Sequence, residues 1–209
     1  MKKQLRLLLV DFDGVLSNGR FYHVPDDIRG QVGSRAAQII FSRENKSMVH
    51  QWMRGELTYQ DVHERVARET GTDVHLLDNL LKESIAYMPL NPSLLHHLAL
   101  LRSKGVIVSL FTNNMDIFDD VSREHHQLDT HFDHIYSSSA YGQLKLENEV
   151  LVRKALQEAN VDSESTALVD DSPDSFARAS SYGITTFLYD QYEDSQVAFE
   201  QWLEREYHW

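Results

Sequence analysis

The stretch LRLLLVDFDGVL, residues 5–16, decides how this chain folds. Its first half is a short apolar run that predicts a buried strand over residues 5–11. Asp11 and Asp13 end this run, and Gly14 then permits a tight turn, so the same residues are also ordinary turn formers. Open α/β sheets bind their ligands just beyond the carboxyl ends of the strands. The two carboxylates therefore stand where a sheet of this class would hold a ligand.

Two carboxylates at this spacing can divide the work of a covalent reaction. One can attack an electrophile while its neighbour moves a proton. A hard cation shared between them would keep the attacking carboxylate ionised, because carboxylate oxygen is a preferred ligand of such ions. The pair is a candidate catalytic site whose assignment depends on the rest of the chain.

Length and composition describe an ordinary globular protein. The chain has 209 residues, of which 42% are hydrophobic and 25% charged, enough for one large α/β domain or for a core with a smaller insertion. It has no cysteine, which excludes disulfides, thiolate metal ligands and thiol nucleophiles. The longest apolar run is too short to span a membrane, and Asp11 interrupts the only run that resembles a signal peptide. We expect a cytoplasmic protein that does not associate with membranes.

The net charge of −12 argues against nucleic acid as a partner, because a phosphate-binding surface needs clustered lysine and arginine. Most of the acidic excess lies on predicted helices after Glu147 and is expected to form a solvated face. Asp170 and Asp171 are the exception. The sequence leaves the oligomeric state open between monomer and homodimer.

From residue 91 onward, helices and strands alternate regularly. This alternation predicts βαβ units and a doubly wound parallel sheet. Asn91 and Pro92 have the cap and first-turn chemistry of a helix that Gly105 ends. Strands are expected over residues 106–111, 135–137, 166–169 and 184–189, and further helices from Asp116 and over 147–160, 173–182 and 194–206.

Between Leu16 and residue 91 the pattern is helical only, from about Ser34 to Tyr87. A helix carrying the apolar residues Met48, Val49, Trp52 and Met53 ends at Gly55, and the next begins with a capping box at Thr58 and Asp61 and ends at Gly71. An all-helical insertion after the first strand would lie over the carboxyl edge of the sheet, the position of a lid. We expect an α/β core of residues 1–16 and 91–209 and a helical cap of residues 17–90.

Four polar clusters follow successive strands of the predicted sheet. They are Asp11 with Asp13, Thr112 with Asn113, Lys145, and Asp170 with Asp171. Parallel strands end at one edge of the sheet, so these side chains are expected to converge there. Their order and types resemble the haloacid dehalogenase-like hydrolase superfamily, over residues 5–16 and 106–190.

The resemblance implies a role for each residue. Asp11 would be the nucleophile and a magnesium ligand, and Asp13 the general acid and base whose backbone carbonyl also binds the metal. Thr112 and the Asn113 backbone amide would bind the phosphoryl oxygens, and Lys145 would neutralise charge on nucleophile and phosphate. Asp171 would bind magnesium, and Asp170 would act through a bound water or as a second ligand.

Two positions depart from the pattern of this family. Ser175 stands where relatives usually have Asn or Asp, so that the neighbouring Asp174 either substitutes for it or only caps the helix. Leu146 follows Lys145 where proline is usual, which puts the shape of that loop in doubt more than its chemistry. No metal-binding spacing involves the 11 histidines, and most of them are expected at the surface.

Within the superfamily, Asp13 favours phosphoryl transfer, because dehalogenation needs no proton for its leaving group. The insertion is placed like the helical cap of the first subclass, and residues 52–58 weakly resemble its small-metabolite phosphatase branch. The chain is therefore interpreted as a magnesium-dependent phosphatase of a small phosphorylated substrate such as a sugar phosphate. A phosphomutase with the same aspartyl-phosphate and a non-hydrolytic binding module are the alternatives.

Overall fold

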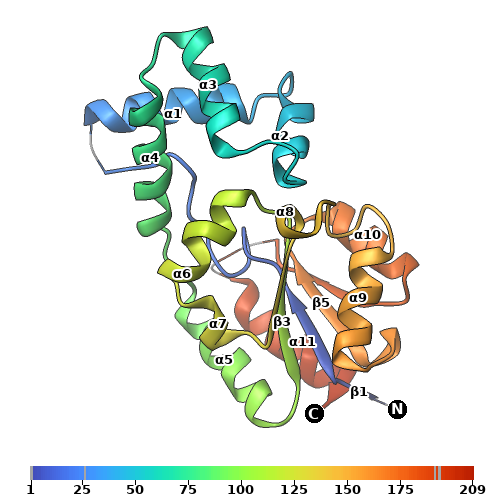
Figure 1. Ribbon diagram of the computed structural model, residues 1–209. Helices are drawn as coiled ribbons and strands as arrows, with labels where there is room; N and C mark the ends of the chain where they lie inside the picture. The colour runs from blue at the N-terminus through green and yellow to red at the C-terminus, as the bar shows by residue number, and fades with distance from the viewer. Residues whose placement is uncertain (1, 26, 191, 193) are drawn as a thin grey trace.

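The computed structural model describes residues 2–209 apart from residues 26, 191 and 193. Its centre is a parallel sheet of five strands in the order β4-β3-β2-β5-β6, the doubly wound arrangement that the sequence predicts (Figure 1). These strands are β2 (Leu7–Val10), β3 (Ile107–Thr112), β4 (His134–Ser137), β5 (Thr166–Asp170) and β6 (Thr185–Leu188).

Helices cover both faces of this sheet, and the alternation of side chains in β2 shows why. Leu8 and Val10 pack into one apolar cluster with α5 (Pro92–Ser103) and α11 (Ser195–Glu206). Leu7 and Leu9 point to the opposite face and pack with α9 (Val150–Ala159) and α10 (Pro173–Ser181). A strand buried on both faces is apolar at every position, which is the run seen in the sequence.

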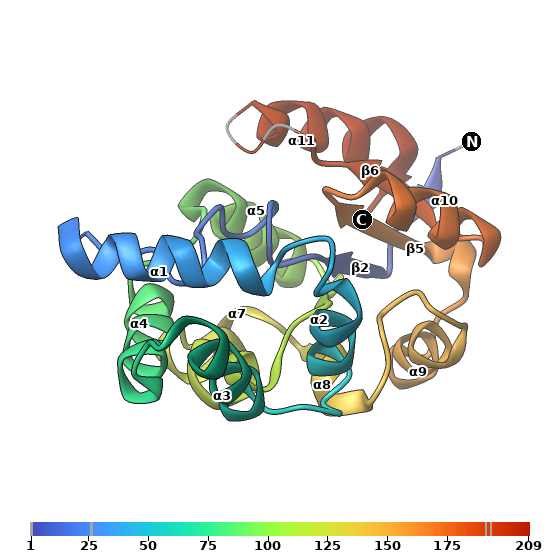
Figure 2. The same cartoon turned by 90° about the horizontal axis from the view of Figure 1, so that it is seen from above.

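Four helices form the inserted cap above the carboxyl edge of the sheet (Figures 1 and 2). They have a separate apolar cluster, to which the core adds Met115 and Ile117. Thr58 forms the predicted capping box with Asp61, and Gly71 ends the same helix in the left-handed conformation. The cap helices are α1 (Asp27–Ile40), α2 (Lys46–Met53), α3 (Tyr59–Thr70) and α4 (Val74–Ala86).

The two connections between cap and core lie side by side. Ser17 and Leu90 form an antiparallel bridge, and the Asn91 backbone N–H donates a 2.8 Å hydrogen bond to the Leu16 carbonyl. The chain therefore enters and leaves the cap at one place, where the two connecting segments are hydrogen-bonded to each other.

Three expectations about the elements were wrong in detail. The first cap helix begins at Asp27 and not near Ser34, and the helix expected from residue 147 begins at Val150. The helix expected from Asp116 begins there but is not regular: it contains a π-helical turn (Phe118–Ser122), continues as the short α6 (Arg123–His125) and is followed by a separate short helix, α7 (Leu128–His131). A two-stranded pairing of β1 (Lys3–Gln4) with β7 (Tyr207–His208) was not expected, because strands this short carry no periodic signal. The remaining elements are α8 (Ser138–Tyr141), which directly follows β4, and a 3₁₀ helix (Ser163–Ser165) directly before β5.

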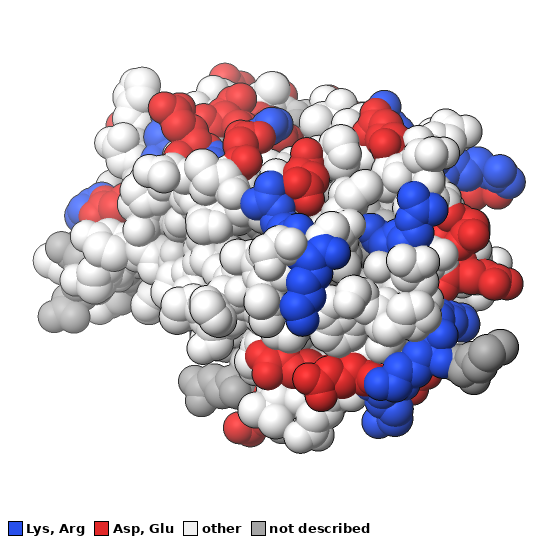
Figure 3. Space-filling view, turned by 90° about the horizontal axis from the view of Figure 1, so that it is seen from below, with Lys and Arg blue, Asp and Glu red and all other residues white. Residues whose placement is uncertain are grey.

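Within the described residues, no helix is both long and apolar enough to cross a membrane. On the face opposite the cap, basic and acidic side chains are interspersed (Figure 3). That face carries no large area of a single charge.

Candidate active site

The sheet brings the predicted residues to one edge. Asp11 and Asp13 directly follow β2, Thr112 is the last residue of β3, and Asp170 is the last residue of β5. Because β2 lies between β3 and β5, these residues come from three adjacent strands. Lys145 reaches the same edge from the loop between α8 and α9.

Lys145 lies between two of the carboxylates. Its Nζ is 2.5 Å from Asp11 Oδ2 and 2.6 Å from Asp170 Oδ2, and its side chain is almost fully buried. Burial opposes the charge on this lysine, but the carboxylates of Asp11 and Asp170 outweigh burial and raise its pKa. Lys145 therefore stays protonated and fixes the positions of both acids.

Asp11 and Asp13 are held in an environment that disfavours their charge. Burial raises the pKa of Asp11 to about 7 against the opposing effect of Lys145, and Asp170 raises it further. Burial likewise raises the pKa of Asp13 to about 7, with Lys145 opposing and Asp171 contributing to the increase. The Phe12 backbone N–H donates a 2.8 Å hydrogen bond to Asp11 Oδ1, which turns the other oxygen toward Lys145.

Three of the acids form a set that suits a metal ion. Single carboxylate oxygens of Asp11, Asp170 and Asp171 all lie within 4.8 Å of one another. Burial raises the pKa of Asp171, and repulsion from the nearby Asp170 raises it further. Gly14 leaves room for this set, because a Cβ at its position would lie 2.2 Å from Asp171 Oδ2. Clustered hard oxygen donors with excess negative charge fit Mg²⁺.

Thr112 and its two neighbours line the other side of the site. Thr112 is fully buried, and the Asn113 side-chain oxygen accepts a 2.7 Å hydrogen bond from the Lys145 backbone N–H. Asn114 Nδ2 donates a 3.0 Å hydrogen bond to Asp13 Oδ2. The sequence did not single out Asn114, and its polar side chain after a strand end was the available signal.

The Lys145 loop keeps its shape without proline. Leu146 is buried in the apolar cluster beneath α9, and Arg178 Nη1 donates a 3.3 Å hydrogen bond to its carbonyl. Packing and this hydrogen bond thus supply the rigidity that a proline ring would give.

The structure also places the other departure, Ser175 and its neighbour Asp174. Asp174 is exposed in the first turn of α10, and Ser175 is mostly buried on the same helix. In the part of the chain that the structure describes, the acidic set contains Asp11, Asp170 and Asp171 and not Asp174. Asp174 is placed where its charge favours the helix N-terminus.

The turn between α2 and α3 brings the cap onto the core. Asp116, just after β3, accepts hydrogen bonds from Trp52 Nε1 at 2.6 Å and from the Tyr59 backbone N–H at 3.0 Å. Arg54 pairs with Glu147, two residues after Lys145. The sequence predicted Asp116 only as the N-terminal residue of a helix. Its carboxylate accepts hydrogen bonds from the cap domain as well as from the Ile117 N–H.

The interior of the cap contains a second polar group, which the sequence did not predict. His63 is fully buried, with its Nε2 2.7 Å from the Tyr22 hydroxyl and its Nδ1 2.5 Å from Asp78 Oδ1. Its spacing from Tyr59, Val62 and Val66 puts it on the apolar face of α3, the signal that could have identified it. Burial lowers the pKa of His63 although Asp78 opposes this, so the neutral ring is favoured.

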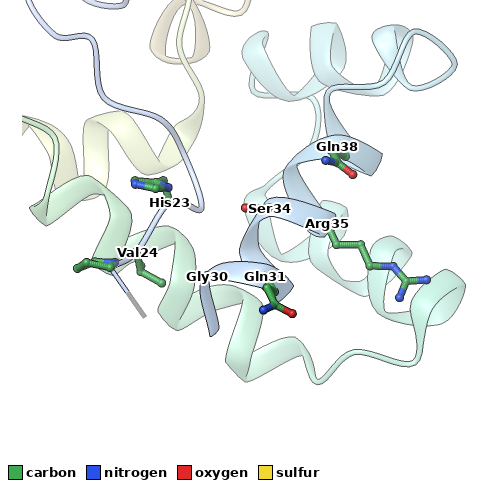
Figure 4. A pocket seen from close by; sticks show the side chains of 8 residues that line it. His23, Val24, Gly30, Gln31, Ser34, Arg35 and Gln38 are labelled. Atoms are coloured by element: carbon green, nitrogen blue, oxygen red, sulfur yellow. The ribbon is translucent and has the colours of Figure 1, made fainter. Parts of the chain in front are cut away.

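A cavity of about 700 Å³ lies in the cap and is separate from the acids. It is bounded by His23 and by side chains from successive turns of α1, among them Gln31, Arg35 and Gln38 (Figure 4). No carboxylate of the candidate site lines it.

Residues 5–178 match the sequence profile of the haloacid dehalogenase-like hydrolases. The chain belongs to this family and is a hydrolase by that membership. No curated protein matches the sequence of the chain.

Solved structures share the fold at low sequence identity. A predicted HAD-like family hydrolase from Porphyromonas gingivalis is 20% identical with a TM-score of 0.75, and the match covers 96% of this chain and 98% of that one. A HAD family enzyme from Bacteroides thetaiotaomicron, an aspartate-to-alanine mutant in complex with magnesium and inorganic phosphate, is 19% identical with a TM-score of 0.69, covering 88% and 93%. The L-2-haloacid dehalogenase of Xanthobacter autotrophicus, with chloropropionic acid covalently bound, is 15% identical with a TM-score of 0.66, covering 98% and 85%.

Proposed function

We propose that this hydrolase is a magnesium-dependent phosphatase that acts on a small phosphorylated metabolite, such as a sugar phosphate, through an aspartyl-phosphate on Asp11. The observation that carries the proposal is the second carboxyl, Asp13, beside a cluster of acids whose spacing suits a metal ion. Release of a halide requires neither a proton nor a cation, because halide is a stable anion. Release of an alcohol from phosphate needs both a proton and neutralisation of charge.

The reaction proceeds in two displacements. A carboxylate oxygen of Asp11 forms a bond to phosphorus while the bond to the leaving oxygen breaks, and Asp13 gives that oxygen its proton. Asp13, now ionised, then takes a proton from water as the water oxygen bonds to phosphorus and the bond to Asp11 breaks. A pKa of about 7 suits Asp13 to both transfers, because the group gains and loses a proton with equal ease near neutral pH.

The remaining residues bind and neutralise the phosphoryl group. Thr112 and the Asn113 backbone amide would donate hydrogen bonds to its oxygens, and Lys145 would balance the charge that accumulates between it and Asp11. Asp11, Asp171, Asp170 and the Asp13 carbonyl would hold Mg²⁺. When bound, the ion supplies positive charge to the phosphoryl oxygens and favours the ionised form of Asp11.

The cap limits what can reach these residues. It lies over the carboxyl edge and contacts the core through Asp116 and Glu147. A covered site excludes water and large substrates, which favours a small monoester over a phosphoprotein. The Bacteroides thetaiotaomicron enzyme, which binds magnesium and inorganic phosphate on the same fold, supports this choice of chemistry.

The decisive experiment compares two leaving groups of different chemistry on the purified protein. We expect hydrolysis of p-nitrophenyl phosphate with MgCl₂ and none after chelation with EDTA, and no chloride release from 2-chloropropionate. Chloride release without phosphate release would instead make the chain a dehalogenase. A panel of sugar phosphates would then identify the substrate, and transfer of phosphate between sugars without its release would indicate a phosphomutase.

A further inference from the structure

Asn114 makes the only side-chain hydrogen bond found to the Asp13 carboxyl among the described residues. Its Nδ2 donates to Oδ2 at 3.0 Å, and Asn114 itself is 1% exposed. A buried amide donor at this distance restricts the rotation of the carboxyl about its side-chain torsions. The other carboxyl oxygen is left without a protein hydrogen bond in that part of the chain and is available for a proton transfer.

The orientation of the Asn114 amide is set by its own neighbours. Its Oδ1 accepts a 3.2 Å hydrogen bond from the Met115 backbone N–H, which can only donate. The nitrogen must therefore face Asp13, and the amide cannot turn over without losing both hydrogen bonds. A donor held in this way is already oriented before substrate binds.

Ser138 connects the Asn114 backbone to the cap. Its Oγ accepts a 2.9 Å hydrogen bond from the Asn114 N–H and lies 2.6 Å from the Met53 carbonyl and 3.0 Å from the Asn114 carbonyl. A hydroxyl has one proton to donate. With the cap in place, that proton goes to the nearer carbonyl, that of Met53, the last residue of α2.

The cap approaches this hydroxyl closely because of a glycine. Gly55 has φ of +68°, and a Cβ at its position would lie 2.7 Å from the Ser139 carbonyl. Only a residue without a side chain fits both the backbone conformation and the contact. The turn after α2 is thus shaped to bring the Met53 carbonyl onto Ser138.

Resting on the phosphatase reaction proposed above, we propose that Asn114 is a positioning residue for Asp13, and that Ser138 ties it to the seated cap. Asn114 touches no reacting atom and acts through the carboxyl that it orients. Through Ser138, the orientation of the Asp13 carboxyl then depends on whether the Met53 carbonyl is in place. Closure over the substrate and correct placement of the proton donor are coupled by one hydroxyl.

Substituted phenyl phosphates test the first part. Phenyl phosphate and p-nitrophenyl phosphate have nearly the same shape, but phenolate needs a proton to leave far more than nitrophenolate does. Their kcat/KM values report only the steps up to release of the phenol. We expect Asn114→Ala to lower kcat/KM for phenyl phosphate about tenfold more than for p-nitrophenyl phosphate, since the variant loses the hydrogen bond that orients Asp13 and stabilises it as it gives up its proton and becomes charged.

The same assay separates the possible failures. Equal loss on both substrates would mean that Asn114 is only structural, and no loss would mean that it is idle; either result overturns the inference. A wild-type protein that hydrolyses neither substrate with Mg²⁺ would overturn the proposed function itself. If Asn114→Ala does not fold, Asn114→Leu, which has similar volume and no donor, is expected to give the same selective loss.

Ser138 and Ser139 form a matched pair for the second part. The Ser139 hydroxyl contacts Asp119 and Ser137 within the core and reaches neither Asn114 nor the cap. We expect Ser138→Ala to reduce kcat/KM for phenyl phosphate about threefold more than for p-nitrophenyl phosphate, and Ser139→Ala to change the ratio by less than about 1.5-fold. Identical behaviour of the two variants would overturn the link to the cap.

Discussion

The carboxyl edge of the sheet and the interior of the cap both bury ionisable side chains, but they treat them in opposite ways. In the cap, His63 has a partner on each ring nitrogen, Tyr22 and Asp78, and its neutral form is favoured. At the sheet edge, one lysine lies among acids whose mutual repulsion and burial raise their pKa values. A satisfied buried group stabilises the fold, whereas a crowded and incompletely neutralised one indicates chemistry. The comparison can be tested by removing groups from each region.

The largest expected effect is on catalysis at the sheet edge. Asp11→Asn removes the attacking oxygen and keeps the shape of the side chain, so we expect kcat to fall by at least about 10³-fold. The thermal midpoint should not fall, because a buried carboxyl of raised pKa is replaced by a neutral amide. Phosphate release and circular dichroism check the two parts, and residual activity near that of the wild type would remove Asp11 as nucleophile.

Magnesium should stabilise the sheet edge and leave the cap unaffected. At 100 times its dissociation constant, a ligand of the native state adds about 2.7 kcal/mol, which corresponds to about 5 to 10 °C in a chain of this size. Asp171→Asn should remove most of this shift. Asp174→Asn, which changes an exposed acid in the first turn of α10, is the control and should retain it; loss of the shift in the control alone would give Asp174 the metal-binding role.

The cap network should matter for stability and not for chemistry. His63→Ala leaves the Tyr22 hydroxyl and Asp78 without a partner in a buried site, at an expected cost of about 2 to 4 kcal/mol in the free energy of unfolding. Below its melting transition the variant should keep the kcat of the wild type. Urea denaturation and the phosphatase assay test this, with exposed His75→Ala expected within about 0.5 kcal/mol of the wild type. A large loss of kcat in folded His63→Ala would put the cap network in the reaction.

The two regions should respond to pH with opposite signs in metal-free protein. The pKa of Asp13 is raised in the folded state, so its contribution to stability is present near pH 4 and is lost as pH rises through about 7. The pKa of His63 is lowered, so its contribution is present above about 6.5 and is lost as pH falls through its folded value. Thermal midpoints measured across pH should fall less at rising pH in Asp13→Asn than in the wild type. They should fall less at falling pH in His63→Gln. Unchanged profiles would contradict the assigned environments.

The contact between the two regions should give the smallest effect. Arg54 and Glu147 are partly exposed, so Arg54→Ala is expected to cost about 1 kcal/mol or less. Loss of this link between cap and core should raise KM about 2- to 5-fold with little change in kcat. Arg153→Ala, which breaks an exposed pair with Glu149 within the core, is the control and should leave KM unchanged. Equal KM values for both variants would show that this pair does not hold the cap.

The residues at the sheet edge were predictable because most of them are marked by short patterns in the sequence around them. The candidate acids and Thr112 stand at or just after the ends of short apolar runs, and a parallel sheet places all such positions together whatever lies between them. Lys145 reaches them from the loop between α8 and α9. The family profile and the fold bear out the superfamily inferred from those four clusters.

What the sequence did not reveal depends on how the cap sits on the core. Asp116 was expected to begin a helix, but its carboxylate receives Trp52 and Tyr59 from the cap, and the chain after it forms a π-helical turn. Asn114 follows a strand end like the predicted residues, but its contact with Asp13 is seen only in the folded chain. His63 lies at helical spacing from apolar neighbours, and a stricter count of that face would have placed it inside.

The attachment of the cap has a consequence for how the molecule is put together. The segment that enters the cap and the segment that leaves it are joined by a bridge between Ser17 and Leu90, and the Asn91 N–H is hydrogen-bonded to the Leu16 carbonyl. Relative to the sheet, residues 17–90 therefore form one long insertion whose two ends are in contact. The cap is thus an insertion at one point of the core, and a change within it can reach the strands that carry Asp11 and Thr112 through this junction and through the contacts at Asp116, Ser138 and Glu147.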